Sequence, residues 1–156
     1  MLGLRARDAH LLIVALAGCT AQPPAPAPET LALAVTISLR SGESWVEVPR
    51  TVPKRHRIKA TLQHLLRGPS PAEIEQGLAL DTSSATGFKD FQIGDGVVDI
   101  TLTGGCDAAG REPTVYDAIA RTLVQFEDVK GLRVRDPDGL TLAPASPRSW
   151  PRCLVP

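Results

Sequence analysis

The sequence has few aromatic residues and no excess of charge of either sign. Phe, Trp and Tyr make up 4% of the 156 residues, and 17 basic side chains balance 17 acidic ones. A balanced charge argues against nucleic acid as a partner, because nucleic acids select basic surfaces, and against a charge-driven contact with a membrane. The scarcity of aromatic rings weakens the case for a site that binds its ligand by stacking.

The N-terminal region also lacks an apolar run long enough to cross a membrane. Its apolar stretch covers residues 11–17, whereas a spanning helix needs about 20 apolar residues. The stretch follows Arg5 and Arg7 and ends in small residues at Ala17-Gly18. A basic start, a short apolar core and small residues are typical of a secretory signal peptide, so we interpret residues 1–18 as a processing signal.

Cys19 directly follows this signal and makes Leu16-Ala17-Gly18-Cys19 similar to a bacterial lipobox. The resemblance to bacterial lipoproteins implies cleavage before Cys19, a diacylglycerol thioether on its sulfur and a further acyl chain, such as palmitate, on the new amino group. Two or three chains anchor a protein stably, whereas one does so only marginally. The alternative is an ordinary signal peptide with a cysteine near its cleavage site.

Residues 19–29 form the expected tether between the lipid and the folded part. Proline occupies every second position from Pro24 to Pro28, and no charged residue lies between Ala21 and Glu29. Such a segment favours extended polyproline II and acts as a semi-rigid spacer. The remainder, residues 30–156, is long enough to bury a core and is interpreted as one domain.

The first half of this domain predicts a strand hairpin followed by two helices. Apolar side chains alternate over residues 31–39, a turn follows, and residues 45–48 form the partner strand. Residues 58–66 carry apolar side chains at helical spacing, and Gly68-Pro69 ends that helix. Ser70-Pro71-Ala72-Glu73 has the residues of a capping box and predicts a short second helix to about Gln76. Residues 78–87 are expected to be a loop.

The second half predicts another hairpin, another helix and two final strands. Residues 88–93 and 97–102 flank Gly94-Asp95-Gly96, and an Asp-Gly pair between apolar runs indicates a tight hairpin turn. A helix is expected from Thr114 to Phe126. A strand over 129–134, a turn over 136–139 and a closing strand over 140–142 complete the pattern.

The order of elements is therefore β-β-α-β-β-α-β-β. It predicts an α+β fold in which two helices pack on one face of a mainly antiparallel sheet.

This pattern resembles the GerM, or GerMN, sporulation and germination domain found in bacterial lipoproteins. The resemblance covers residues 35–142 and departs from the family at 81–87, where the family usually has a proline-containing turn. It implies an interaction module of the cell envelope, similar in fold to ring-building domains, with no established catalytic residues and no cofactor. The matching residues are Leu62, Leu65, Leu66, Gly68, Pro69, Ser70, Glu73, Gly77, Leu78, Gly96, Val97, Val98, Asp99, Ile100, Leu123, Gln125, Phe126 and Val129.

Two cysteines remain if Cys19 carries lipid. Cys106 and Cys153 would then lie in an oxidising compartment, which favours a disulfide but leaves two free thiols or a catalytic Cys106 as alternatives. The pair lacks the CxxC spacing of zinc modules. Gly105-Cys106 and the C-terminal residues 151–156 also resemble a subgroup of the family whose members carry this cysteine pair.

Other candidate site residues are better explained by structural roles. His56 and His64 are expected on an exposed surface, although either is a conceivable partner for a nucleophilic Cys106. The aspartates at 99, 117, 136 and 138 lack calcium-loop spacing, and Gly104-Gly105 lacks a phosphate-loop lysine, so we predict no metal or cofactor. Trp45 and Trp150 would suit a glycan platform, but packing roles are favoured.

The sequence thus predicts a non-enzymatic, lipid-anchored, extracytoplasmic protein. Its expected partners are the membrane, through the lipid, and an envelope protein or a second copy of itself. In a host with two membranes, Thr20 replaces the aspartate that commonly retains lipoproteins at the inner membrane, so the outer membrane is favoured. The alternatives are a cell-wall glycan binder and an envelope enzyme that uses Cys106.

Overall fold

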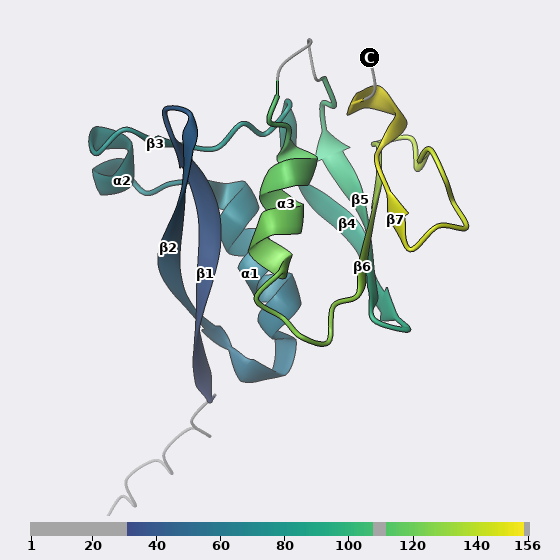
Figure 1. Ribbon diagram of the computed structural model, residues 1–156, viewed down its shortest axis with the longest axis horizontal. Coiled ribbons are helices and arrows are strands. Elements are labelled where there is room, and N and C mark those ends of the chain that lie inside the picture. Colours follow the sequence, from purple (N-terminus) through teal and green to yellow (C-terminus); the bar gives the residue numbers. More distant parts are fainter. Residues whose placement is uncertain (1–30, 108–111, 155–156) are drawn as a thin grey trace, which may run out of the picture.

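The computed structural model describes residues 31–107 and 112–154, and it confirms the α+β class (Figure 1). Residues 1–30, with the lipobox, Cys19 and the tether, lie outside the described residues. In chain order the elements are β1 (Ala32–Ser41), β2 (Ser44–Pro53), the short 3-10 helix η1 (Lys54–His56), α1 (Arg57–Arg67), α2 (Pro71–Glu75), β3 (Leu78–Ala79), β4 (Ala85–Gly94), β5 (Val97–Gly104), α3 (Val115–Leu123), β6 (Gly131–Arg135), β7 (Arg148–Ser149) and η2 (Arg152–Leu154).

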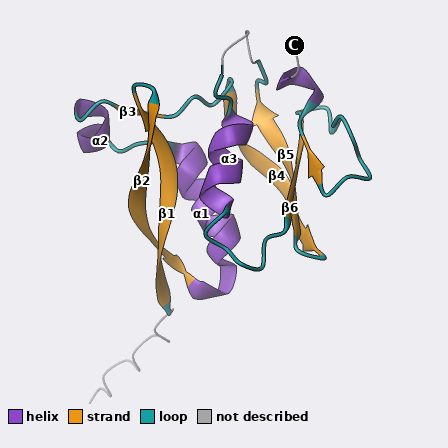
Figure 2. Cartoon of the chain, in the orientation of Figure 1, coloured by secondary structure: helices purple, strands orange, loops and turns teal. Residues whose placement is uncertain are grey.

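The strands form two sheets, and the expectation of one sheet with helices on one face is wrong. The sheet orders are β2-β1-β3 and β4-β5-β6-β7. Helices α1 and α3 lie between these sheets (Figures 1 and 2). The second sheet is mixed, because α3 carries the chain back so that β6 runs parallel to β5. The sequence pattern predicts antiparallel hairpins, so it does not indicate this parallel crossover.

The first hairpin follows directly from the alternation of its side chains. Val35, Ile37 and Leu39 on β1 are buried, and β1 pairs with β2 over the full length of both strands, from Ala32 opposite Pro53 to Ser41 opposite Ser44. The two-residue turn between them places Gly42 at φ 58°, a backbone conformation that glycine adopts without steric cost. The predicted hairpin is confirmed and extends five residues further than expected along β2.

The helices bury the side chains that their spacing predicts. Ile58, Leu62, Leu65 and Leu66 of α1 are buried between the sheets. The capping box of α2 is present: Glu73 Oε2 accepts from the Ser70 amide at 2.8 Å, and Ser70 Oγ accepts from the Glu73 amide at 3.4 Å. Capping of this kind satisfies amides that the first helical turn leaves unpaired.

Several element boundaries differ from the sequence expectation. Residues 78–87 were expected to be a loop, but β3 pairs with the end of β1 and β4 already begins at Ala85. Helix α3 ends at Leu123, so Phe126 lies beyond it in the following turns. The closing strand is β7 rather than 140–142, of which only Thr141 forms a bridge, to Pro151.

A side chain from the end of α3 occupies the edge of β1 that β2 does not cover. Gln125 Oε1 accepts from the Thr36 amide at 2.9 Å, and its Nε2 donates to the Thr36 carbonyl at 2.7 Å. Thr122 Oγ1 accepts from the Ser38 amide at 3.0 Å. These bonds take the place of a neighbouring strand, which an open sheet edge would otherwise recruit.

No helix among the described residues is long and apolar enough to cross a membrane.

Candidate functional site

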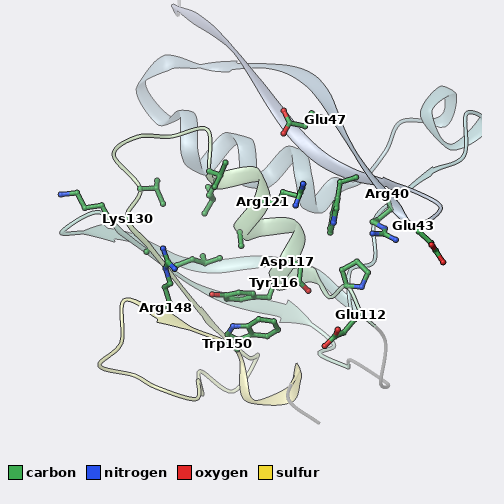
Figure 3. A pocket seen from close by; sticks show the side chains of 18 residues that line it. Arg40, Glu43, Glu47, Glu112, Tyr116, Asp117, Arg121, Lys130, Arg148 and Trp150 are labelled. Atoms are coloured by element: carbon green, nitrogen blue, oxygen red, sulfur yellow. The ribbon is translucent and has the colours of Figure 1, made fainter.

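A groove of about 1100 Å³ opens between the two sheets (Figure 3). Its floor is the exposed side of α3, one wall comes from β1 and β2, and the other comes from β6 and the C-terminal segment. The lining residues are Arg40, Glu43, Trp45, Glu47, Glu112, Pro113, Tyr116, Asp117, Ala120, Arg121, Leu123, Val124, Val129, Lys130, Gly131, Leu132, Arg148 and Trp150.

The first wall is centred on Trp45. Arg40 is its direct cross-strand neighbour, and the Arg40 guanidinium carbon lies 5.2 Å from the centroid of the indole. Arg121 of α3 lies 5.5 Å from the same ring. Arg40 also donates to the Gly42 carbonyl at 2.8 Å and 3.1 Å, which fixes its orientation. Two guanidinium groups therefore hold the half-buried indole against α3 by cation–π attraction.

The opposite wall is centred on a stacked pair of rings, Tyr116 and Trp150. Their centroids are 4.2 Å apart and their planes are inclined by 22°. The carbonyl of Trp150 accepts from Thr141 Oγ1 at 2.8 Å and from the Leu142 amide at 3.0 Å, so the C-terminal segment positions this indole. Burial raises the pKa of Tyr116; Arg148 opposes this and Asp117 adds to it. The phenol stays protonated and keeps its hydrogen-bond donor.

Charges of both signs surround these rings (Figure 3). The lining contains four acidic side chains, Glu43, Glu47, Glu112 and Asp117, and four basic ones, Arg40, Arg121, Lys130 and Arg148. Asp117 is already engaged, because its Oδ2 accepts from the Thr114 amide at 2.7 Å at the start of α3. The groove as a whole therefore presents aromatic surface framed by balanced charge, and the described residues that line it include no histidine, cysteine or serine.

The structure joins Cys106 and Cys153 in a disulfide outside this lining. Their Cα atoms are 5.7 Å apart and 47 residues apart in sequence, and the bond ties the chain after β5 to η2. The sulfur of Cys106 is therefore bonded to another cysteine in this structure rather than presented as a thiolate.

The two histidines do not share a helix face. His56 is exposed and ends η1, whereas His64 is half-buried in α1. Partial burial, followed by the charges of Arg67 and Arg50, lowers the pKa of His64. No group of three or more His, Cys, Asp or Glu side chains within residues 31–107 and 112–154 is arranged to hold a metal ion.

Asp99 belongs to an ion-pair cluster of the second sheet. It receives hydrogen bonds from Arg133 at 2.8 Å and from Arg135 at 2.9 Å and 3.0 Å. Partial burial acts to raise its pKa, but the hydrogen bonds from Arg135 and Arg133 outweigh it and the pKa is lowered. Asp136 Oδ1 accepts from the Asp138 and Leu140 amides, as expected of a turn residue.

The structure reveals a relation between Trp45 and Trp150 that the sequence does not indicate. We expected packing roles for both, and each does pack, but the two indoles also line one groove from opposite walls. They lie on β2 and directly after β7, in different sheets, so their approach depends on how the sheets sit around α3. Nothing in the spacing of the two residues along the chain signals this.

The model of the family Germane, described as "Sporulation and spore germination", matches residues 36–138. Among solved structures, the tandem GerMN domains of the sporulation protein GerM from Bacillus subtilis match with a TM-score of 0.48 and 23% sequence identity. That match covers 74% of this chain and 42% of the GerM chain. No curated protein shows significant similarity.

Proposed function

Because this chain belongs to the Germane family of sporulation and spore germination domains, we propose that it is a lipid-anchored envelope protein whose domain binds another protein without catalysing a reaction. The family match confirms the resemblance to GerM-type domains that the sequence motifs indicate. The observation that carries the proposal is the groove between the sheets, with its three aromatic rings and its ordered arginines.

The composition of the groove favours a protein as its occupant. Tryptophan, tyrosine and arginine dominate the residues that contribute most to binding energy at protein interfaces. Here Trp45, Tyr116 and Trp150 supply the aromatic surface, and Arg40 and Arg121 are held in place over an indole. Side chains that are ordered before binding lose little conformational entropy when a partner arrives. The partner is an envelope protein or a second copy of this chain.

A non-catalytic role is supported by the chemistry of the residues that carry shifted pKa values. Glu73, Asp99 and Arg135 owe their pKa shifts to ion pairs, and His64 owes its lowered pKa to partial burial and then to Arg67 and Arg50. None of these four residues lines the groove. Tyr116 does line it, but its pKa is raised, which makes it a poor base at neutral pH. The groove thus offers no group poised to exchange protons near pH 7 among the shifts resolved for the described residues.

Site-specific photo-crosslinking in intact cells tests the groove. A photoreactive residue at Val124, which is 84% exposed and lines the groove, should capture a partner. The matched control is Ile74 on α2, 59% exposed and outside the lining. Trp45→Ala should abolish the Val124 product, whether that product is another protein or a dimer. The same products from both positions, or none from Val124, would contradict the proposal.

The lipid anchor has its own test. Metabolic labelling with an alkyne fatty acid should mark the parent protein, and the Cys19→Ser variant should lose both the label and its partition with membranes. A Cys19→Ser variant that is processed and fractionates with membranes like the parent would refute anchoring, whatever the outcome at the groove.

A second candidate function is favoured by the position of both tryptophans on one groove. Indole faces stack well on the apolar faces of sugar rings, so a cell-wall glycan is the alternative occupant. Pull-down with purified peptidoglycan tests it, with Trp45→Ala and Trp150→Ala as variants. Retention of the parent and loss in both variants would favour the glycan; no retention of the parent would dismiss it.

The enzyme alternative depends on a free Cys106. Thiol titration of the unreduced mature protein should detect no reactive thiol, because Cys106 and Cys153 are bonded to each other. Free thiols at Cys106 and Cys153 in the unreduced protein would restore the alternative of a cysteine nucleophile.

A further inference from the structure

The balanced charge of the whole chain conceals a segment that carries only one sign. Between Glu47 and Glu73 the sequence has no acidic residue, and the intervening stretch holds Arg50, Lys54, Arg55, Arg57, Lys59 and Arg67. Charge-balanced composition was our reason to exclude a charge-driven membrane contact. The structure places the middle of this basic stretch, η1 and the start of α1, at one end of the molecule (Figure 1). Balanced whole-chain charge therefore does not argue against a charge-driven membrane contact at this end.

The most basic part of the stretch folds against the point where the described chain begins. Helix η1 (Lys54–His56) follows β2, and the Lys54 amide donates to the Leu31 carbonyl at 2.8 Å. Figure 1 shows η1 and the start of α1 beside the first residues of β1, at the end of the molecule away from the C-terminus. The residues that precede Leu31, and with them any lipid on Cys19, therefore join the domain beside these cations.

The cations of this end point into solvent. Lys54, Arg55 and His56 of η1 are exposed, and so is Lys59 in the first turn of α1, whose Nζ lies 6.0 Å from the Phe91 ring. The charge of Arg57 is partly neutralised, because its guanidinium pairs with the Asp128 carboxylate at 2.6 Å. Glu127 is the other acidic side chain that shares a pocket with Arg57. Lys54, Arg55 and Lys59 are thus three exposed cations within six residues of the chain, and we call them the basic end.

We propose that the basic end docks on the anionic phospholipid headgroups of the membrane in which the protein is anchored. The inference rests on the proposed lipid anchor for its geometry: Cys19 is separated from Leu31 by a short segment, which at about 3.5 Å per residue reaches at most about 40 Å. Tethering at this end keeps the basic end near the bilayer and directs it toward the headgroups. Each lysine or arginine near an anionic membrane strengthens binding about fivefold.

Docking at this end would also hold the domain in one orientation. Helix η2 lies at the far end, next to the C-terminus (Figure 1), and it carries Cys153 of the disulfide. The groove is lined by α3 and by both sheets rather than by η1. A domain that both hangs from a lipid and rests on headgroups presents its groove to partners in a defined direction, whereas a domain held only by its tether rotates freely.

Vesicle binding of the mature chain with Cys19→Ser tests the inference without any contribution from fatty chains. Phosphatidylcholine vesicles that contain phosphatidylglycerol should bind this chain, and added salt should weaken binding because it screens exposed charges. Phosphatidylcholine vesicles alone should not bind it. The triple change Lys54→Gln, Arg55→Gln and Lys59→Gln should reduce affinity by about 100-fold, about fivefold for each cation.

Two controls separate the basic end from charge in general and from misfolding. Changing Arg67 at the last residue of α1, Lys89 on β4 and Arg152 on η2 to Gln removes the same charge from exposed positions outside the basic end and should leave binding within about fivefold of the parent. Lys54→Arg with Lys59→Arg keeps the charge and should retain binding, and circular dichroism should show the parent fold in all variants.

Several results would overturn the inference. They are equal binding to neutral vesicles, unchanged binding of the Lys54, Arg55 and Lys59 variant, an equal loss in the Arg67, Lys89 and Arg152 control, and binding to soluble polyphosphate but not to vesicles. Because the assay omits the acyl chains, it fails or succeeds independently of the fatty-acid labelling experiment that tests the anchor.

Discussion

Sheet β2-β1-β3 is built largely from one continuous stretch, residues 32–53, whereas sheet β4-β5-β6-β7 depends on segments distant in sequence. In the first sheet a two-residue turn aligns ten residue pairs of β1 and β2. In the second, β6 reaches β5 only after α3, and β7 adds two parallel pairs. The comparison teaches that local patterning specifies the first sheet, while long-range packing and a covalent link complete the second.

The largest expected effect comes from removing that covalent link. Cys106→Ser with Cys153→Ser opens a loop of 47 residues, which costs up to about 4 kcal/mol of unfolding free energy in the chain-entropy account. Urea unfolding measures the loss. Native-state hydrogen exchange should show that protection falls first in β6 and in the segment around η2. An equal loss of protection in β1 and β2 would contradict the difference between the sheets.

A smaller effect is expected where two segments of the second sheet approach most closely. A Cβ at Gly131 would lie 3.1 Å from Pro147 Cβ and closer still to the Pro147 carbonyl oxygen. Gly131→Ala should therefore cost about 1–3 kcal/mol through overpacking. Gly94→Ala, where an added Cβ meets open space, should change stability by less than about 0.5 kcal/mol. Equal melting temperatures for the two variants would show that Pro147 moves aside at little cost to make room for the added Cβ.

The first sheet also has long-range contacts along the edge of β1 that β2 does not cover, and breaking one of them sharpens the comparison. Gln125→Ala removes both hydrogen bonds to Thr36 and should cost about 1 kcal/mol, since water can replace the lost partners at this exposed edge. Gln63→Ala on the exposed face of α1 is the control. Chemical denaturation measures both. A loss as large as that of the disulfide variant would mean that the first sheet is not locally specified.

The smallest expected effect is a pH-dependent change in the free energy of unfolding, caused by the Glu73 carboxylate. The hydrogen bonds from Arg50, at 2.8 Å and 2.7 Å, and from the Ser70 amide lower the pKa of Glu73 from 4.5 to about 2. Because the folded state holds the carboxylate ionised, this contribution is complete above pH 4.5 and is lost as pH falls toward 2. Glu73→Gln should thus destabilise at pH 7 and progressively less below pH 4.5.

The control for that experiment is Glu75→Gln, which removes the same charge from an exposed position of α2. Its effect on unfolding should be smaller than that of Glu73→Gln at pH 7. A destabilisation by Glu73→Gln that stays constant from pH 7 to pH 2 would assign the effect to packing rather than to the ion pair.

The features that the sequence predicts correctly are those that neighbouring residues determine. The alternation before Leu39, the Asp95-Gly96 turn and the capping box at Ser70 each depend on residues a few positions apart. The second sheet was missed because β7 has two residues and no alternation, and because the parallel pairing of β6 requires α3 to pack first. Short strands of this kind gain their stability from tertiary contacts.

The groove and the basic end were missed for related reasons. The groove joins Trp45 to Trp150 across two sheets, and whole-chain charge averages the cluster at Lys54 with acids elsewhere. Composition describes how much charge a chain has, whereas the surface depends on where folding places it.

The register of β1 against β2 has a mechanical consequence. Ala32 lies opposite Pro53 and Ser41 opposite Ser44, so the strand that receives the N-terminal segment is paired along its whole length with an antiparallel neighbour. Tension that enters at residue 31 runs along the axis of β1 and loads its pairs in shear, all at once, instead of peeling them apart one by one. We therefore expect a domain that is held through its first strand to resist a steady pull better than one that is held through a loop.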